Sequence, residues 1–412
     1  MENNNTPHDN TNTCSDISEE FDEKMSVIVD SQVEKNLQKA GGIIRNGGLV
    51  SFPTETVYGL GANALDSDAA TSIFTTKERP MTDPLICHIA EKEDAAELID
   101  ENENIVEIFD LLAERFWPGP LTIVVKANND KISPIITADT GYVGIRIPNN
   151  PIALKLIKES GKPIAAPSAN KFGHVSPTKA EHVLNDFKND GVFILNGGAC
   201  NFGIESTVVK IYFKETLNDE NLHINLLILR RGGISEWEFN KFISECELSN
   251  SKIVLTVECV EKKHFTEESH KMEAPGQFLR HYAPNLPSYM LNKQRLNKEE
   301  GSIPLSISKC VFLDFKSENI TIKDKVSLYL DLSEKGDFVE AINRVYDYLR
   351  ISETQEEGEM VLITDLFNLS SDETLHSSHK EHASALADRL FRAVSGKSIT
   401  VNEGFNKYNI NY

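Results

Sequence analysis

The sequence predicts an α/β protein in which an open-sheet domain is followed by a smaller α/β domain. Short apolar runs typical of buried strands alternate with amphipathic helical stretches over residues 31–260. A polar segment rich in Pro and Gly follows at residues 261–287, and a shorter strand and helix series occupies residues 288–412. The length of 412 residues also exceeds one ordinary core.

The first domain is predicted to begin with a helix and a buried strand. Val33, Leu37, Ala40 and Ile44 share one helical face, and Leu49–Pro53 forms a short apolar run. Further predicted strands are Pro84–Ala90, Leu121–Lys126, Val143–Ile147, Pro163–Ala166, Val192–Leu195, Ser206–Ile211 and Ile224–Leu229. Further predicted helices are Ala69–Thr76, Glu107–Phe116, Ile152–Ser160 and Thr178–Phe187. The pattern leaves open whether the sheet is parallel or mixed.

The second domain is predicted to be a small Rossmann-like unit. Its expected strands are Cys310–Phe315, Val326–Leu332 and Glu359–Thr364. Helical stripes cover Phe338–Leu349 and Ala383–Val394. It has no Gly-x-Gly-x-x-Gly motif, so nucleotide binding is not implied there.

Composition and charge limit the class of protein. Hydrophobic residues make up 40% and charged residues 25%, as in ordinary globular proteins. The formal net charge of −21 argues against broad, sequence-independent binding to nucleic acid. The six cysteines form no Cys-x-x-Cys pair, so we predict neither a protein-held metal nor a disulfide framework. Residues 1–30 are expected to be a disordered acidic tail, without a signal or membrane segment, and a cytoplasmic location is expected.

The segment Lys77-Glu78-Arg79-Pro80 is a candidate anion site. A residue before proline favours extended backbone, in which residues two apart point to the same side. We therefore expect Lys77 and Arg79 to point together, which suits a shared anion such as a triphosphate. The alternative is a solvated Lys and Arg on the surface.

Ser168 and Asn170 directly follow the strand predicted at Pro163–Ala166. Ligands of open α/β sheets bind near the carboxyl ends of strands, and these two side chains offer uncharged donors and acceptors. A turn or helix cap is the alternative.

Other polar side chains lie beside predicted strands. A group of hydroxyls after Leu49–Pro53 precedes two glycines that would permit close backbone approach, although a tight turn would use the same residues. The candidates of this kind are Thr54, Thr56, Tyr58, Thr122, Arg146, Ser206 and Arg230.

Seven blocks in order resemble the threonylcarbamoyl-AMP synthase family in its long, two-domain form. They are Ser51–Ala64, Lys77–Leu85, Phe116–Val124, Val143–Pro148, Ala166–Thr178, Gly203–Val208 and Ile228–Ser235. The segment Ala274–Pro284 resembles the linker of the long form, and Ala385–Ala393 gives a weaker match in the C-terminal domain. Two residues depart from the family pattern, since Asp83 stands where Asn is usual and Arg231 where Pro is usual.

The resemblance implies a twisted sheet around a concave, positively charged cavity. It implies synthesis of L-threonylcarbamoyladenylate from L-threonine, bicarbonate and ATP, with Mg²⁺ on the triphosphate and release of pyrophosphate. This is the first step of N6-threonylcarbamoyladenosine formation in tRNA, and the downstream partner would be a tRNA threonylcarbamoyl transferase. The linker at residues 261–287 would close over the site.

The resemblance also implies residue roles. The catalytic tetrad would be Lys77, Arg79, Ser168 and Asn170. Contacts to threonine and bicarbonate would come from Thr54, Thr56, Tyr58, Arg79, Thr122, Arg146 and Ser206. Contacts to ATP would come from Lys77, Ser168, Asn170, Ser176, Arg230 and Tyr282.

Two other functions compete with this reading. A non-catalytic RNA-binding module could use the same fold, and a weak RNA contact is compatible with the enzyme as well. A carbamoyl-transfer enzyme of hydrogenase maturation contains a similar domain, but such proteins carry zinc-finger regions. The absence of Cys-x-x-Cys pairs here argues against that alternative.

Overall fold

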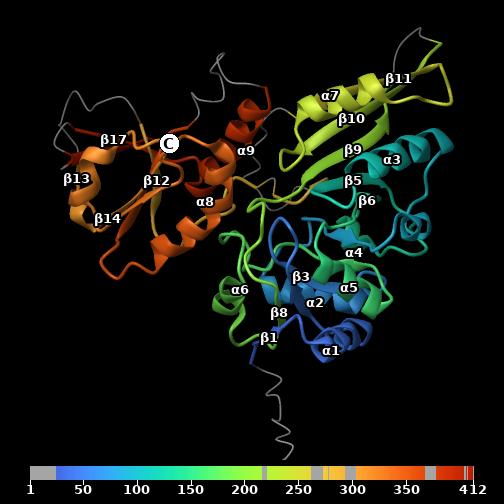
Figure 1. Cartoon of the computed structure of the whole chain (residues 1–412), viewed down its shortest axis with the longest axis horizontal. Helices are drawn as coiled ribbons and strands as arrows, with labels where there is room; N and C mark the ends of the chain where they lie inside the picture. Colours follow the sequence, from blue (N-terminus) through green and yellow to red (C-terminus); the bar gives the residue numbers. More distant parts are fainter. Residues whose placement is uncertain are drawn as a thin grey trace, which may run out of the picture.

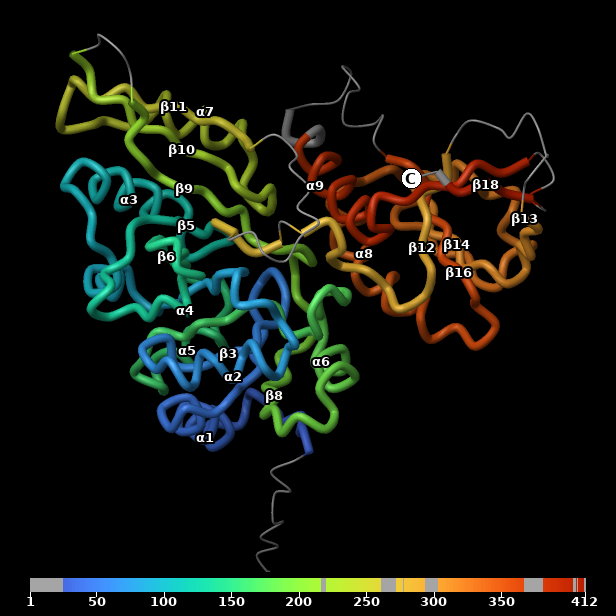
Figure 2. Tube along the Cα trace, turned by 180° about the vertical axis from the view of Figure 1, so that it is seen from behind, coloured from blue at the N-terminus to red at the C-terminus, as the bar shows by residue number. Residues whose placement is uncertain are grey.

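A computed structural model describes residues 25–215, 220–260, 272–276, 278–292, 303–366, 377–402, 405 and 407–411. Two α/β parts lie side by side, and the C-terminal part turns helices α8 (Phe338–Glu353) and α9 (Ser377–Ala393) toward the larger part (Figure 1). The view from behind shows the same arrangement (Figure 2). The predicted α/β class is confirmed.

The larger part is built on an eleven-stranded sheet in the order β1-β8-β2-β3-β7-β4-β6-β5-β9-β10-β11. Strand β5 is parallel to β9, whereas β9 is antiparallel to β10, so the sheet is mixed. The strands are β1 (Val27–Asp30), β2 (Val50–Phe52), β3 (Gly59–Asn63), β4 (Ile86–His88), β5 (Leu121–Lys126), β6 (Tyr142–Arg146), β7 (Ile164–Ala165), β8 (Phe193–Asn196), β9 (Thr207–Phe213), β10 (Leu222–Arg230) and β11 (Ile253–Cys259).

Amphipathic helices cover this sheet. Helices α1 and α5 bury Leu37, Ile44 and Leu156 against Phe52 and Leu195 of the sheet. A second cluster joins α2, α3 and α7 to the strands around β5 and β9. The helices of this part are α1 (Glu34–Arg45), α2 (Ser67–Lys77), α3 (Glu103–Phe116), α4 (Pro134–Thr137), α5 (Pro151–Ser160), α6 (Ala180–Phe187) and α7 (Glu236–Glu245), with a 3-10 turn at Lys92–Glu97.

The C-terminal part contains a seven-stranded sheet in the order β13-β18-β17-β12-β16-β14-β15. Five neighbouring strands from β17 to β15 are parallel, as in a Rossmann-like unit. The strands are β12 (Ser288–Leu291), β13 (Ile303–Pro304), β14 (Cys310–Asp314), β15 (Leu328–Asp331), β16 (Met360–Thr364), β17 (Ser398–Val401) and β18 (Lys407–Asn411), with 3-10 turns at Ile307–Lys309 and Ile320–Lys325. Three strands were predicted here, which is too few, because the order of β12, β13, β17 and β18 comes from pairing with distant strands.

The boundary predicted for the N-terminal tail is wrong. Residues 27–30 form strand β1 and pair in parallel with β8, where Ile28 lies opposite Ile194. A run of three β-branched residues, Val27 to Val29, explains this pairing. Residues 1–24 of the tail and residues 261–271 of the linker lie outside the described residues.

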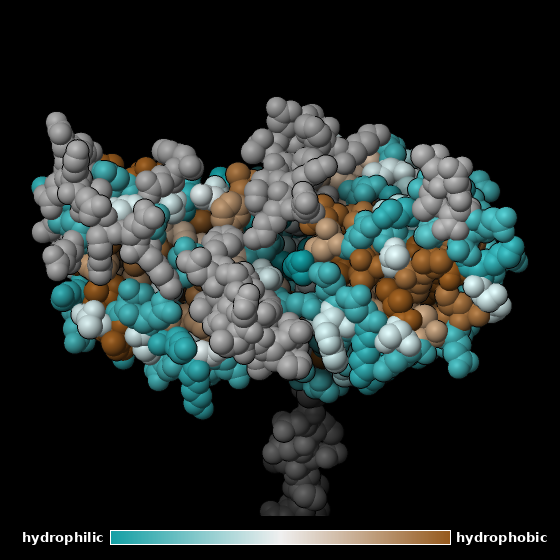
Figure 3. All heavy atoms as spheres, turned by 90° about the horizontal axis from the view of Figure 1, so that it is seen from above, coloured by the Kyte–Doolittle hydropathy of each residue, from teal (hydrophilic) through white to brown (hydrophobic). Residues whose placement is uncertain are grey.

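Seen from above, hydrophilic side chains cover much of the visible surface (Figure 3). A group of hydrophobic side chains lies at the right of this view, on the larger part of the molecule. In the described part of the chain, no helix has the length and apolar character needed to cross a membrane.

Candidate active site

A small cavity of about 50 Å³ lies where several strand ends of the larger sheet meet the linker. Strands β4 and β6 and the segments after β2 and β7 form its walls, together with the segment before β9 and the end of β10. The lining residues are Thr54, Thr56, Val57, Gly59, Arg79, Ile86, His88, Arg146, Ala166, Pro167, Ser168, Glu205, Ser206, Arg230, Pro275, Gly276 and His281.

Lys77 and Arg79 lie close together, but not for the predicted reason. Lys77 is the last residue of helix α2, and Glu78 ends the helix in a left-handed conformation with φ of 57°. The amide of Arg79 then donates back to the Phe74 carbonyl at 2.9 Å. The helix therefore continues up to Lys77, and the left-handed turn brings the two cations together rather than an extended strand.

Arg79 is held from one side and faces the cavity with the other. Its Nη2 forms an ion pair of 2.9 Å with Asp83, which is buried, and donates to the Pro84 carbonyl. Its Nε donates to the Asp83 carbonyl. Burial lowers the pKa of Arg79, and the Asp83 carboxylate opposes this. The unusual Asp83 therefore acts as the partner that fixes Arg79.

Lys77 supports the Ser-x-Asn segment. Its Nζ donates to the carbonyl of Ser168 at 2.7 Å and to the carbonyl of Asn170. The Ser168 hydroxyl donates to Asn170 Oδ1 at 2.5 Å, and the Asn170 amide bonds to the Lys171 and His174 carbonyls. Three residues of the predicted tetrad, Lys77, Ser168 and Asn170, are thus joined by hydrogen bonds. Arg79 and Ser168 line the cavity, whereas Lys77 and Asn170 do not.

Arg146 links the strand β6 end to the segment after β2. Its Nη2 lies 2.7 Å from Glu55 Oε1 and 3.1 Å from Thr56 Oγ1, to which it donates. The Thr54 hydroxyl lies 2.8 Å from that of Thr56 and donates to the Val57 carbonyl. These contacts fix both threonine hydroxyls in the cavity wall.

Arg230 links the end of strand β10 to the residue before strand β9 and to the linker. Its Nε and Nη2 donate to the Ser206 carbonyl, and Nη2 also donates to the Ser206 hydroxyl at 3.1 Å. Its Nη1 donates to the Pro275 carbonyl of the linker at 3.2 Å. Ser206 Oγ lies 2.8 Å from Thr122 Oγ1, so Thr122 lies behind Ser206 and does not line the cavity.

Three further predicted residues lie outside the cavity lining. The Tyr58 hydroxyl donates to the Gly198 carbonyl and accepts from the Gly197 amide, and burial raises its pKa. The Ser176 hydroxyl donates to Glu205 Oε1 at 2.7 Å. Tyr282, which belongs to the linker, is fully buried.

The residue patterns missed Glu55 and His88, which both line the cavity. Burial and the nearby Arg146 lower the pKa of His88 to about 3, so its imidazole is neutral. A single acidic residue between two candidate threonines, and a single His in an apolar strand, were the available signals.

The cavity lining carries a small positive excess of charge in an acidic protein. Three arginines line it, Arg79, Arg146 and Arg230, against two carboxylates, Glu55 and Glu205. Lys77 is buried beside Arg79. Burial, followed by the charge of Arg79, holds the pKa of Lys77 well below its usual range. An anion bound in this cavity would relieve that repulsion.

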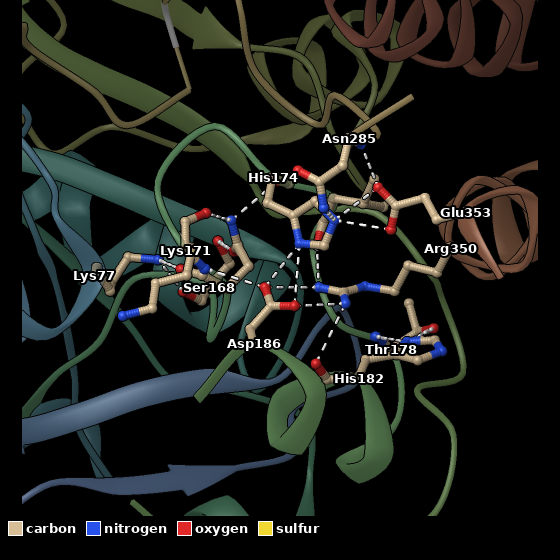
Figure 4. A network of polar contacts seen from close by, with 12 residues as sticks. Lys77, Ser168, Lys171, His174, Thr178, His182, Asp186, Asn285, Arg350 and Glu353 are labelled. Atoms are coloured by element: carbon tan, nitrogen blue, oxygen red, sulfur yellow. Dashed lines mark hydrogen bonds and ion pairs between the residues drawn. The ribbon is translucent and has the colours of Figure 1, made fainter. Parts of the chain in front are cut away.

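Side chains of the C-terminal part also contact the loop that follows Ser168 and the neighbouring helix α6 (Figure 4). Arg350 of α8 forms an ion pair of 2.9 Å with Asp186 of α6. His174 bridges Asp186 at 2.9 Å and Glu353 of α8 at 3.0 Å. The hydrogen bonds to the two carboxylates outweigh burial, so the pKa of His174 is raised.

Comparisons with known proteins agree with this architecture. A family model described as "Telomere recombination" matches residues 42–232, and one described as "Threonylcarbamoyl-AMP synthase, C-terminal domain" matches residues 243–395. A threonylcarbamoyl-AMP synthase of Pyrococcus abyssi is 38% identical over 326 residues, which cover 78% of this chain and 86% of the relative. One of Schizosaccharomyces pombe is 38% identical over 289 residues, covering 65% and 67% of the two chains.

Solved structures support the same assignment. The structure of P. abyssi Sua5 complexed with L-threonine matches with a TM-score of 0.66 and 31% identity. The match covers 92% of this chain and 98% of that one. The fold and site thus define a two-domain nucleotidyltransferase. The chain belongs to the threonylcarbamoyl-AMP synthase family.

Proposed function

We propose that this chain joins L-threonine, bicarbonate and ATP into L-threonylcarbamoyladenylate and releases pyrophosphate. The observation that supports this most directly is the convergence of Arg79, Arg146 and Arg230 on one buried cavity. Threonine carries a carboxylate, and the carbamate and the triphosphate are anionic as well; buried guanidinium groups bind carboxylate and phosphate oxygens well.

The reaction needs charge stabilisation and no covalent intermediate. The threonine amine attacks the carbon of bicarbonate or CO2, and the carbamate forms as the amine loses a proton and, from bicarbonate, water leaves. A carbamate oxygen then attacks the α-phosphate of ATP, and the bond to the β-phosphate oxygen breaks to release pyrophosphate. Positioned donors and cations stabilise such a transfer.

The contacts favour a division of the cavity into a side for threonine and the carbamate and a side for the phosphates of ATP. Arg146, Thr54 and Thr56 form a fixed group of polar side chains suited to threonine and the carbamate. Arg79, Ser168, Ser206 and Arg230 form the other side and suit the phosphates. Lys77 and Asn170 would act by holding Ser168 in place, Thr122 by holding Ser206, and Ser176 by holding Glu205.

The proposed site needs the linker to move. Cavities that hold drug-sized ligands measure roughly 300–1,000 Å³, far more than the cavity seen with Pro275, Gly276 and His281 over it. We assign this arrangement to the closed form of the segment that Arg230 anchors at Pro275. Closure over bound substrates would shield the labile adenylate from water.

Magnesium is proposed as part of the substrate, bound to the triphosphate of ATP. Among the residues the structure describes, no group of three or more His, Cys, Asp or Glu side chains could hold a metal ion. The carboxylates at the cavity are already paired with arginines. Their role would be to orient cations.

The proposal extends to the place of the chain in tRNA modification. The division into a synthase domain at 31–260, a linker at 261–287 and a C-terminal domain at 288–412 is part of it. The adenylate would pass to a separate tRNA threonylcarbamoyl transferase, and the enzyme would act in the cytoplasm.

A product assay tests the proposal. Purified protein is incubated with ATP, Mg²⁺, bicarbonate and L-threonine, and adenylate and pyrophosphate are measured by mass spectrometry and a coupled assay. We expect equal amounts of both products and none when threonine is omitted. Folded protein that binds RNA and yields no adenylate would contradict the proposal and favour the RNA-binding module.

A further inference from the structure

We propose that Tyr346 and Arg389 of the C-terminal part are positioning residues of the synthase site. They hold Glu205 in the cavity wall, and they hold Tyr282 so that the linker stays closed over the cavity. The kinetic consequence of this inference rests on the proposed function.

Glu205 is the first group that both residues contact. Tyr346 on α8 donates its hydroxyl to Glu205 Oε2 at 2.8 Å, and Arg389 on α9 donates Nε to the same oxygen at 3.2 Å. The other oxygen accepts from Ser176. Glu205 lines the cavity and directly precedes Ser206, which Arg230 holds. The position of this wall therefore depends on two side chains from the C-terminal part.

Tyr282 is the second group that both residues contact. Its ring stacks on that of Tyr346, with centroids 5.3 Å apart and an interplanar angle of 26°. The Arg389 guanidinium lies 5.3 Å from the Tyr282 ring centroid. Tyr282 has a φ of 60°, a left-handed conformation that is costly for an aromatic residue. Such a conformation persists only where contacts with neighbouring residues compensate its cost. Tyr346 and Arg389 make such contacts with the Tyr282 ring.

The residues on either side of Tyr282, His281 and Ala283, connect the linker to the site. His281 lines the cavity, and the amide of Ala283 donates to the Gly173 carbonyl at 2.9 Å. An added Cβ on Gly276 would lie 2.8 Å from the Tyr282 hydroxyl, so the two linker segments are in contact. Loss of the support under Tyr282 would therefore release the cover of the cavity.

Burial sets these two residues apart from ordinary interface residues. Arg389 and Tyr346 are both 0% exposed. The hydrophobic cluster that contains Tyr346 also includes Val57, which lines the cavity, and Ile204, which precedes the lining residue Glu205. Arg389 also donates to the Arg231 carbonyl at 2.8 Å, beside Arg230. The contacts of Arg389 thus reach the wall, the linker and the strand end that holds Arg230.

The first arm of the test needs no substrate. Amide hydrogen exchange of Ala283 is measured in wild type, Arg389→Lys and Tyr346→Phe. The matched control is Asp347→Asn, which breaks the 2.8 Å ion pair to Lys179 and alters the 3.3 Å contact to His182 between the same two parts. We expect Ala283 exchange at least about tenfold faster in Arg389→Lys and unchanged in the control. Tyr346→Phe keeps the stacked ring and should retain protection.

The second arm measures adenylate synthesis. Loss of wall geometry should lower kcat/KM for ATP by about tenfold to a hundredfold in Arg389→Lys, with a smaller loss in Tyr346→Phe, since misplacement by about 1 Å is costly. Exchange and kcat/KM that match those of Asp347→Asn would overturn the inference. If Arg389→Lys fails to fold, an unchanged kcat/KM in Tyr346→Phe overturns it. A wild type without adenylate would contradict the proposed function, while the exchange arm would still decide the positioning of Tyr282.

Discussion

The ammonium of Lys77 donates to the carbonyl of Ser168 at 2.7 Å, although 91 residues separate them in the sequence. The contact joins the end of helix α2 to the segment after strand β7. It fixes the backbone that presents the Ser168 hydroxyl to the cavity. The two short motifs are therefore one structural unit.

Replacing Lys77 should disable this unit. We expect Lys77→Met to lower kcat/KM for adenylate synthesis by about a hundredfold, because the Ser168 segment loses its anchor. Lys77→Arg should not restore activity, since Lys77 is 1% exposed and a larger, planar guanidinium does not fit. Steady-state kinetics check this. Activity of Lys77→Met within about threefold of wild type would contradict the assigned role.

The Arg146–Glu55 pair should control stability as well as activity. Both side chains are at most 10% exposed, so Arg146→Met leaves a buried carboxylate uncompensated. We expect a loss of about 3–5 kcal/mol in the free energy of unfolding.

The double variant Arg146→Met with Glu55→Gln serves as the control for this prediction. It removes the unpaired charge and should recover part of the lost stability, although neither variant should make adenylate. Urea unfolding followed by circular dichroism measures both. A double variant as unstable as Arg146→Met would show that charge pairing is not the cause.

The His174 bridge should make stability depend on pH. The pKa of His174 is raised in the folded state, so its contribution is fully present below about 6.5, the unfolded value, and is lost as pH rises through the folded value. Asp186 and Glu353 face the ring, and Arg350 lies nearby.

The comparison for this prediction is His174→Gln. The stability advantage of wild type over this variant should shrink between pH 6 and pH 9, as measured by thermal unfolding. The difference between the two proteins removes the contribution of His182, whose pKa is lowered. An advantage that grows with pH would contradict the sign.

Asp186 should cause a separate loss of stability at acidic pH. Burial alone would raise its pKa, but His174 and Arg350 lower it to about 2. Its contribution is therefore present above about 3.9 and is lost as pH falls toward 2. Urea unfolding between pH 5 and pH 2.5 should show a smaller loss in Asp186→Asn than in wild type. Parallel curves would exclude Asp186 as the source.

Gly232 should tolerate no side chain. An added Cβ would lie 2.4 Å from the backbone atoms Glu205 O, Ser206 C and Thr207 N, which form the cavity wall. We expect Gly232→Ala to cost about 1–3 kcal/mol of stability and to lower activity. Gly42→Ala in helix α1 is the control, because its nearest neighbour is 3.9 Å away, and it should stabilise by about 0.5–1 kcal/mol. Equal effects of the two changes, measured by urea unfolding, would refute this account.

Hydrophobic patterns predicted the long, regular elements well. Strand β5 has the predicted bounds, and α5 begins one residue before its predicted start. Strand β3 was missed because Gly59 and Gly61 read as a loop, although Phe52 packs where side chains at these positions would lie. Strands β1 and β12 form because they pair with strands that are distant in the sequence, and no local pattern contains that information.

The candidate site followed from the sequence only in part. Polar residues beside strands and the family resemblance indicated Arg79, Arg146, Ser168 and Arg230, which all line the cavity. The extended geometry expected around Pro80 was wrong because the left-handed Glu78 ends helix α2 first. The contacts of Tyr346 and Arg389 depend on how helices α8 and α9 of the C-terminal part pack against the larger part, which spacing along one chain does not encode.

The most direct test of the central claim follows the carbon of bicarbonate. Protein, ATP, Mg²⁺ and L-threonine are mixed with ¹³C-bicarbonate, and the adenylate is analysed by mass spectrometry. We predict one ¹³C in the threonylcarbamoyl group of the adenylate and equimolar pyrophosphate, both lost when Lys77→Met replaces the wild type. An adenylate without the label, or pyrophosphate release that does not require threonine, would contradict the proposed synthase reaction.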